Sequence, residues 1–144
     1  MNEILTFRRA LPSTVLSSND IQSAAEAARL QMLESYGILD SVAEKSYDDI
    51  ARLAAFVCAA PVSLISFFDC DRQWIKARFS SGAFLDNDHE LPRSFAFCEV
   101  AIQEPERVIL VPDMTKDARF ADHALVTGKT KLRLYAAVPL IAPT

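Results

Sequence analysis

The chain has 144 residues, of which 51% are hydrophobic and 24% charged, and its formal net charge is −4 at pH 7. This is the composition of one ordinary globular domain, and at this length a chain can bury roughly 68–70% of its unfolded surface. The basic residues are scattered and the net charge is mildly negative, which argues against nucleic acid and against anionic membrane surfaces as partners. No apolar run approaches the ~20 residues that a membrane-spanning helix needs.

The three cysteines, Cys58, Cys70 and Cys98, lie far apart and form no C-x-x-C pair. A disulfide framework is therefore not expected, and a reducing cytoplasm is the simplest location. The first residues, MNEILTFRRALPSTV, contain paired arginines but no long apolar core after them, so they do not predict a secretory signal. We expect residues 1–17 to form an irregular lead and residues 18–144 to form one domain.

Two helices are predicted before any strand. The first begins after Ser18 or Asn19, either of which can cap it, and ends at Gly37, which tolerates a left-handed conformation. The second begins at Ser41, because Ser41 and Glu44 have the spacing of a capping box. Each helix has an apolar stripe at helical spacing. The stripes are Ile21, Ala25, Ala28, Met32 and Tyr36 in the first helix, and Tyr47, Ile50, Ala54 and Val57 in the second.

A β-hairpin is predicted next, in the segment PVSLISFFDCDRQWIKA. Residues 62–68 are rich in β-branched and aromatic side chains, and residues 73–79 alternate with the period of a strand. Asp69-Cys70-Asp71 supplies the turn, because aspartate side chains bond to the local backbone. Alternate residues of the second strand share a face, namely Trp74, Lys76 and Arg78.

The remaining elements are shorter. We expect a polar loop over residues 80–92, a helix over 94–103, a strand over 107–111, one helical turn near 116–120 and a last strand over 132–141. This order indicates an α+β fold, with a central, mainly antiparallel sheet and helices packed on it.

Five ordered segments resemble a GAF domain, of the subgroup found at the N-terminus of bacterial sensor histidine kinases and diguanylate cyclases. They are RLQMLESYGILDSVAEKSYDDIARLAA, PVSLISFFDCDRQWIKA, SFAFCEVAI, VPDMTKDARFADHALVTG and LRLYAAVPLI. The resemblance implies a GAF/PAS-like antiparallel sheet with helices on one face and a small-molecule pocket beneath loops on the other. It also implies that terminal helices relay a signal to an output kinase or cyclase domain, in the parent protein or in a partner protein.

The chain departs from the subgroup at several positions. Val100 stands where His is usual, Ala137 replaces a Gly, and Ala124 replaces a Pro. The sequence stops at Thr144, where the family continues with two more strands and a helix. We therefore expect an unpaired sheet edge and a pocket that is open in part.

Several side chains are candidates for a ligand pocket. Asp113 and Arg119 lie in PDMTKDARFADH, and an arginine among carboxylates can either order a loop as an ion pair or bind an anionic ligand. The aromatic candidates can line a pocket or belong to the core. The full set of predicted pocket residues is Phe67, Trp74, Lys76, Phe97, Cys98, Asp113, Arg119, Phe120 and Tyr135.

Other chemistry has less support. Cys98 lies near a predicted helix start, which favours a reactive thiol, but a free cysteine is also a common buried residue. Glu99 follows it where bilin-binding relatives have His, so covalent attachment of a chromophore is not expected. No metal is predicted, because the histidines lack ligand spacing in the set Asp86, Asp88, His89, Glu90 and His123. No cofactor is indicated, and no nucleophile or phosphate-loop motif predicts an enzyme.

The sequence thus predicts a noncatalytic cytoplasmic sensory module that binds an unidentified small molecule. Two-component or cyclic di-GMP signalling is the context that the resemblance implies. One alternative is an interaction module that forms a homodimer through the helix over residues 18–36 and has a vestigial pocket. The other is a thiol-based redox sensor that uses Cys98.

Overall fold

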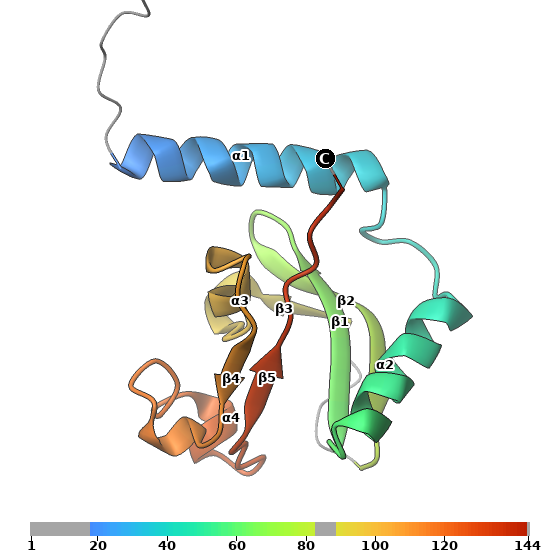
Figure 1. Cartoon of the computed structure of the whole chain (residues 1–144), viewed down its shortest axis with the longest axis vertical. Helices are drawn as coiled ribbons and strands as arrows, with labels where there is room; N and C mark the ends of the chain where they lie inside the picture. Colours follow the sequence, from blue (N-terminus) through green and yellow to red (C-terminus); the bar gives the residue numbers. More distant parts are fainter. Residues whose placement is uncertain (1–17, 83–88, 144) are drawn as a thin grey trace, which may run out of the picture.

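The computed structural model describes residues 18–82 and 89–143, except the side chains of residues 18–21 and 95. The predicted N-terminal lead and two acidic candidates, Asp86 and Asp88, lie outside these ranges. The fold is α+β, as the sequence predicts (Figure 1). The helices are α1 (Ser18–Tyr36), α2 (Lys45–Val57), α3 (Glu99–Gln103) and α4 (Ala124–Thr127), and the strands are β1 (Val62–Phe68), β2 (Arg72–Ser80), β3 (Glu90–Pro92), β4 (Ile109–Val111) and β5 (Tyr135–Ala137).

The predicted hairpin is confirmed as the antiparallel pair β1–β2, in which Phe67 lies opposite Trp74. Its turn has the predicted chemistry. The Asp69 carboxylate accepts hydrogen bonds from the backbone N–H groups of Asp71 at 3.1 Å and Arg72 at 2.9 Å. These bonds satisfy backbone N–H groups that have no partner strand at the turn, so residues within the turn determine its conformation.

Within the described ranges the strands form two small antiparallel sheets, β1-β2-β3 and β4-β5, where the sequence predicts one central sheet. Strand β3 lies in the segment expected to be a loop, and β5 is shorter than the predicted strand over residues 132–141. The backbone just before β5 forms hydrogen bonds with segments outside the sheet. Leu132 N–H donates to Leu125 at 2.8 Å, and the carbonyl of Arg133 accepts from Met114 at 2.6 Å.

Helix α1 has the predicted bounds, and Gly37 ends it with φ +58°. The helix lies across the ends of the strands, beside the β1–β2 turn (Figure 1). Its apolar stripe is not covered, since Met32 is 45% and Tyr36 56% exposed.

The predicted capping box of α2 is wrong. The helix begins at Lys45, and Glu44 at its N-cap makes no side-chain cap bond. Both predicted capping side chains instead contact the Lys76 ammonium, Ser41 Oγ at 2.7 Å and Glu44 Oε1 at 2.6 Å. A buried cation needs oxygen partners, and this need overrides the local capping preference.

The predicted apolar stripe of α2 is also wrong, because Ile50 is 56% and Val57 73% exposed. The buried positions are Ala51 and Ala55. Their small side chains let the helix approach β1 and β2 closely, so packing selects a different face from the one that hydrophobicity favours.

The C-terminal half contains short helical turns in place of the predicted ones. The helix expected over residues 94–103 is a 3-10 turn, Arg93–Phe95, followed by α3. The turn expected near 116–120 lies at Met114–Lys116, where Asp113 accepts a hydrogen bond from Thr115 N–H at 3.0 Å. Helix α4 was not predicted; His123 Nδ1 caps it by accepting from Leu125 N–H at 3.1 Å.

The buried side chains lie in two regions. One lies between α2 and the hairpin, where β2 is buried from Gln73 to Ala77, so both faces of this strand are covered. The other joins β4, α3 and α4 through the cluster Ala101, Ile109, Val111, Met114, Phe120 and Val126. In the described ranges, no helix combines the length and the apolar character that a membrane crossing requires.

Candidate functional site

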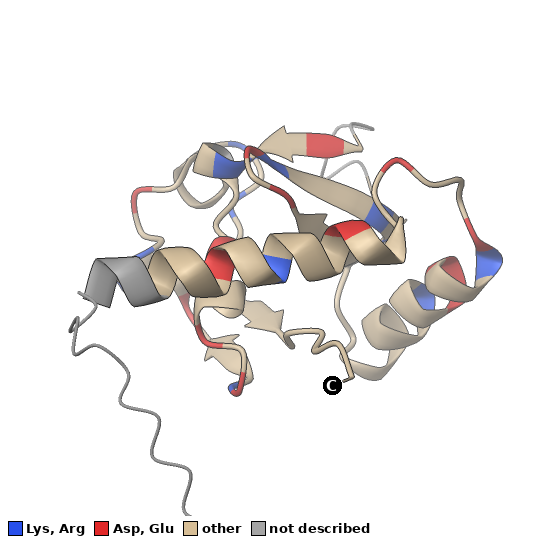
Figure 2. Cartoon of the chain, turned by 90° about the horizontal axis from the view of Figure 1, so that it is seen from above, with Lys and Arg blue, Asp and Glu red and all other residues tan. Residues whose placement is uncertain are grey.

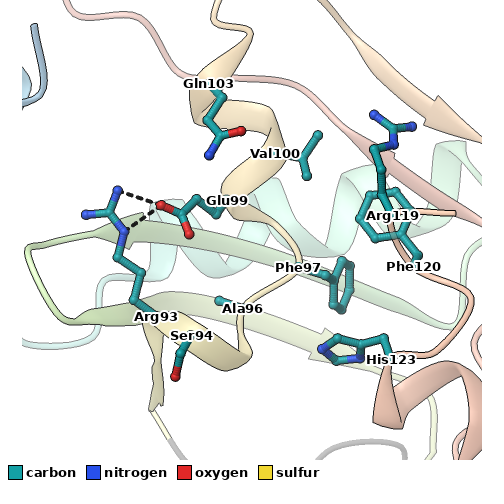
Figure 3. A pocket seen from close by; sticks show the side chains of 10 residues that line it. All are labelled: Arg93, Ser94, Ala96, Phe97, Glu99, Val100, Gln103, Arg119, Phe120 and His123. Atoms are coloured by element: carbon teal, nitrogen blue, oxygen red, sulfur yellow. Dashed lines mark hydrogen bonds and ion pairs between the residues drawn. The ribbon is translucent and has the colours of Figure 1, made fainter. Parts of the chain in front are cut away.

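An open cavity of about 260 Å³ lies between α3 and the segment that leads into α4 (Figure 3). Its walls combine aromatic, polar and charged side chains. They are Arg93, Ser94, Ala96, Phe97, Glu99, Val100, Gln103, Arg119, Phe120 and His123. A larger groove of about 480 Å³ beside the end of α2 is mainly apolar, with Arg52 as its charged residue. The first cavity therefore offers more of the directional groups that specific ligand binding needs.

Aromatic side chains form one wall of the cavity. The ring of Phe97 makes edge contacts with Phe120, His123 and Tyr135, at centroid distances of 6.1, 5.3 and 4.9 Å. Phe120 is 1% exposed and belongs to the core cluster. This wall is thus fixed by core packing and can present a rigid apolar surface to a ligand.

Arg93 forms the opposite side of the cavity, between two carboxylates. Its Nε and Nη2 contact Glu99 Oε1, both at 2.8 Å, and its Nη1 donates to Glu26 Oε1 on α1 at 2.8 Å. Burial disfavours the charge of Arg93, but the bonds to Glu26 and Glu99 prevail and raise its pKa. Hydrogen bonds from Arg29 first, and from Arg93, lower the pKa of Glu26 to about 2.

Arg119 is paired with Asp117 by two hydrogen bonds, of 2.9 and 2.6 Å. The same guanidinium lies over the Phe120 ring, 4.9 Å from its centroid. The bond from Arg119 is the main reason that the pKa of Asp117 falls to about 2. The sequence left two roles open for Arg119, an ion pair that orders the loop and a contact with an anionic ligand. The geometry matches the ion pair.

Three predicted pocket residues, Phe97, Arg119 and Phe120, line this cavity, and Tyr135 contacts Phe97 behind it. Asp113 lies elsewhere and caps the turn Met114–Lys116. The remaining predicted residues lie outside the cavity wall: Phe67, Trp74, Lys76 and Cys98.

Lys76 has a side chain with no exposed surface. Its ammonium contacts the carbonyl of Val42 at 2.7 Å, and lies 5.0 Å from the Tyr47 ring centroid and 5.8 Å from that of Trp74. All these partners belong to α2, the segment before it, or β2. Lys76 therefore joins structural elements, and the structure gives it no path to a ligand in the cavity.

Burial raises the pKa of the Cys98 thiol and that of the Tyr135 hydroxyl. Both groups stay protonated at neutral pH, which argues against a reactive thiol at the half-buried Cys98. Among the described residues, Asp69, Cys70 and Asp71 bring three potential ligand atoms within 4.8 Å of one another. The Asp69 carboxylate is bonded to Arg72 Nε at 2.8 Å, so this carboxylate has a structural role in the turn.

Sequence reasoning missed several lining residues: Arg93, Ser94, Ala96, Glu99, Val100, Gln103 and His123. The sequence could have indicated two of them, because Glu99 and Gln103 are four residues apart and therefore share one face of a helix. The pairing of Arg93 with Glu26 spans 67 residues, and no local pattern announces it.

Fold and site together define a small α+β domain in which a charged and aromatic cavity lies close to a long N-terminal helix. No protein-family model matches the chain. The chain is similar to cyclic di-GMP phosphodiesterase PA2567 of Pseudomonas aeruginosa, with 34% identity over 115 residues. The matched region is 80% of this chain but 19% of that protein, so the chain spans about a fifth of the length of this curated relative.

Proposed function

We propose that the chain is a noncatalytic sensory module of GAF type, which binds a small molecule and relays the change to an output domain in cyclic di-GMP signalling. The five-segment resemblance and the α+β fold support the GAF assignment. The similarity to a small part of a cyclic di-GMP phosphodiesterase supports a signalling role. An output kinase or cyclase domain, in the parent protein or in a partner, would receive the signal.

The observation that carries this proposal is the cavity itself, because one of its walls contacts α1 through Arg93. Its volume is just below the range of about 300–1,000 Å³ that holds drug-sized ligands, which favours a small metabolite. A ligand transmits a signal only if it binds one helix arrangement more tightly than the other. A side chain shared by the cavity and the helix gives a physical basis for such a difference.

Thermal shift with a metabolite set tests ligand binding. A ligand present at a hundred times its Kd stabilises the native state by about 2.7 kcal/mol, which raises Tm by several degrees. Val100→Trp fills the cavity and should abolish the shift, whereas Val108→Trp, on a 67% exposed residue outside the cavity wall, should keep it. If no compound raises Tm, or if Val100→Trp leaves the shift intact, the proposal is wrong.

Dimerisation through α1 is a second candidate, and the exposure of Met32 and Tyr36 in its apolar stripe favours it. Ala28 lies in the same predicted stripe and is exposed. Sedimentation of the full chain should then show a dimer that Ala28→Glu dissociates. A wild-type chain that stays monomeric at all concentrations would eliminate this candidate.

The thiol sensor has less support, because the raised pKa keeps the Cys98 thiol protonated and a protonated thiol is a poor nucleophile. After mild peroxide treatment, mass spectrometry should show Cys98 no more oxidised than the exposed Cys58. Preferential oxidation of Cys98 would restore the redox interpretation.

A further inference from the structure

Helix α1 is tied to the rest of the molecule by polar side chains. Arg29 Nη1 donates to the carbonyl of Phe68 at 2.7 Å, and Arg93 Nη1 donates to Glu26 at 2.8 Å. Figure 2 looks down on α1 and shows acidic and basic positions along the helix as it crosses in front of the sheets. No described side chain of α1 is fully buried, since Met32 and Tyr36 are exposed and Leu30 and Leu33 are half-buried, so apolar burial contributes less here than in a typical packed helix.

Arg93 belongs to this attachment and to the cavity at once. Besides Glu26 and Glu99, it donates to the carbonyl of Asp69 at 2.8 Å, so its guanidinium joins α1, the β1–β2 turn and α3. Its side chain is 19% exposed, and the residue lines the cavity (Figure 3). A ligand group that takes two hydrogen bonds from the Arg93 guanidinium must therefore compete with one of its carboxylate partners, and Glu26 is the partner that holds α1.

We propose that the cavity binds a small organic anion, and that Arg93 exchanges the carboxylate of Glu26 for the anionic group of the ligand, which loosens α1. This inference rests on the proposed function and specifies the ligand class and the relay. The residues of the relay are Glu26, Arg93 and Glu99.

The charges on the cavity wall favour an anion. Two arginines, Arg93 and Arg119, line the cavity together with the carboxylate of Glu99, whereas Glu26 and Asp117, which pair with these arginines, lie outside its wall. The planar fork of an arginine matches the oxygens of a carboxylate or a phosphate. Phe97 offers an apolar surface beside these groups, so a ring or short chain that carries an acidic group has complementary partners.

Glu26 is the carboxylate that Arg93 can release at the lower cost. Its two oxygens also accept from Arg29, at 2.7 and 2.8 Å, so its charge keeps a partner after the exchange. Glu99 has no other ion pair within the described part of the chain, and it takes two contacts from Arg93. Leaving a partly buried charge without a partner is costly, which directs the exchange to Glu26.

The coupling must be reciprocal. If the anion weakens the docking of α1 by some factor, then undocking of α1 strengthens anion binding by the same factor. Glu26→Gln removes one of the contacts that dock α1 and should therefore strengthen anion binding by up to that factor. Loss of the Glu26 charge alone also favours an anion, so the gain in affinity must be accompanied by faster hydrogen exchange in α1 when the anion binds to the wild type.

The experiment uses the full chain and three probes, benzoate, phenyl phosphate and the neutral analogue benzamide. Affinity is measured by titration calorimetry, and the docking of α1 by hydrogen exchange over residues 22–36. In the wild type, both anions should accelerate exchange in α1, while benzamide should not. Glu26→Gln should bind the anions about fivefold more tightly, a modest coupling for allosteric sites, and should show fast exchange without ligand. Glu34→Gln, the same change on the same helix, should behave as the wild type.

The outcomes separate the relay from the proposed function. A difference in affinity between benzoate and phenyl phosphate identifies the acidic group that the cavity prefers. If anions bind but exchange in α1 does not change, or if Glu26→Gln does not tighten binding, the relay is wrong and ligand sensing stands. If neutral compounds from the metabolite set bind and both anions fail, the anion inference is wrong. If nothing binds, the proposed function fails as well.

Discussion

Lys76 shows how one side chain determines local structure over a long stretch of sequence. It is the buried cation that replaces the capping box of α2, through contacts with Ser41, Val42 and Glu44. The charge is tolerated because three oxygens surround the ammonium and two aromatic rings lie beside it.

Replacing Lys76 should therefore cost stability. We expect Lys76→Met to lower the free energy of unfolding by about 1.5–3 kcal/mol, because hydrogen bonds to a charged group are lost and the Val42 carbonyl is left without this donor. Urea unfolding measures the change. Glu44→Gln removes a half-exposed partner, and its cost should be below about 1 kcal/mol. Equal stability of Lys76→Met and the wild type would show that the cation is not needed.

The acidity of Glu26 predicts a pH dependence. Its pKa is about 2 in the folded chain, below its ordinary value of 4.5, mainly because Arg29 donates to it. A lowered folded-state pKa means that the stabilisation is complete above pH 4.5 and is lost as the pH falls toward 2. Tm should fall across this window, and Glu26→Gln should flatten the decline. Glu34→Gln is the control and should keep the wild-type slope; a Glu26→Gln slope equal to that of the wild type contradicts the assignment.

At the scale of elements, the C-terminus of α2 contains a residue in an unfavourable conformation. Ala59 has φ +49°, in the left-handed region, and Ala60 N–H donates to Ala55 at 2.9 Å across it. This is the hydrogen-bond pattern of a Schellman motif, in which glycine is the usual residue at the left-handed position. The chain thus uses alanine where glycine would be free of strain.

Ala59→Gly should stabilise the protein by about 0.5–1 kcal/mol, because relief of the left-handed penalty exceeds the added entropy of the unfolded chain. Chemical denaturation is the measurement. Ala54→Gly, on an exposed position inside the same helix, should destabilise by about 1 kcal/mol, since it has no such strain to relieve. Opposite signs for the two substitutions are the expected result, and a loss at both sites would contradict it.

At the scale of the whole molecule, the question is whether the two buried regions unfold together. Phe120 centres the region between β4, α3 and α4, with ring contacts to Phe97 and Tyr135. Trp74 lies in the other region, on the hairpin, and is 7% exposed. A disturbance near Phe120 that is detected at Trp74 would show that the two regions unfold together.

Phe120→Ala should cost about 3–5 kcal/mol, as large core truncations do, and should shift the Trp74 fluorescence transition together with the far-UV dichroism transition. Phe56→Ala, on an 83% exposed ring, should change stability by no more than about 0.5 kcal/mol. If the Trp74 transition stays in place while the dichroism shifts, the two regions are separate folding units.

The sequence by itself determined the features that depend on neighbouring residues. The bounds of α1, the stop at Gly37, the hairpin and its acidic turn follow from backbone preference and local hydrogen bonds, and the α+β class follows from their order. Phe97, Arg119 and Phe120 were predicted as pocket residues, and they line one cavity. The family resemblance remains a prediction, and the ligand-binding experiments above test the sensory function.

Only the tertiary structure decided which distant groups meet. Helix α2 begins at Lys45, because Lys76 binds the side chains that were predicted to cap it earlier. Strand β3 pairs with β2 in a segment that was expected to be a loop. The buried residues of α2 are Ala51 and Ala55, which do not belong to the predicted stripe. The ion pair between Arg93 and Glu26 also depends on the tertiary structure, because the two residues are 67 positions apart in the sequence and their side chains lie 2.8 Å apart. Such contacts depend on how the chain packs as a whole, and periodicity and capping rules describe only what each segment does alone.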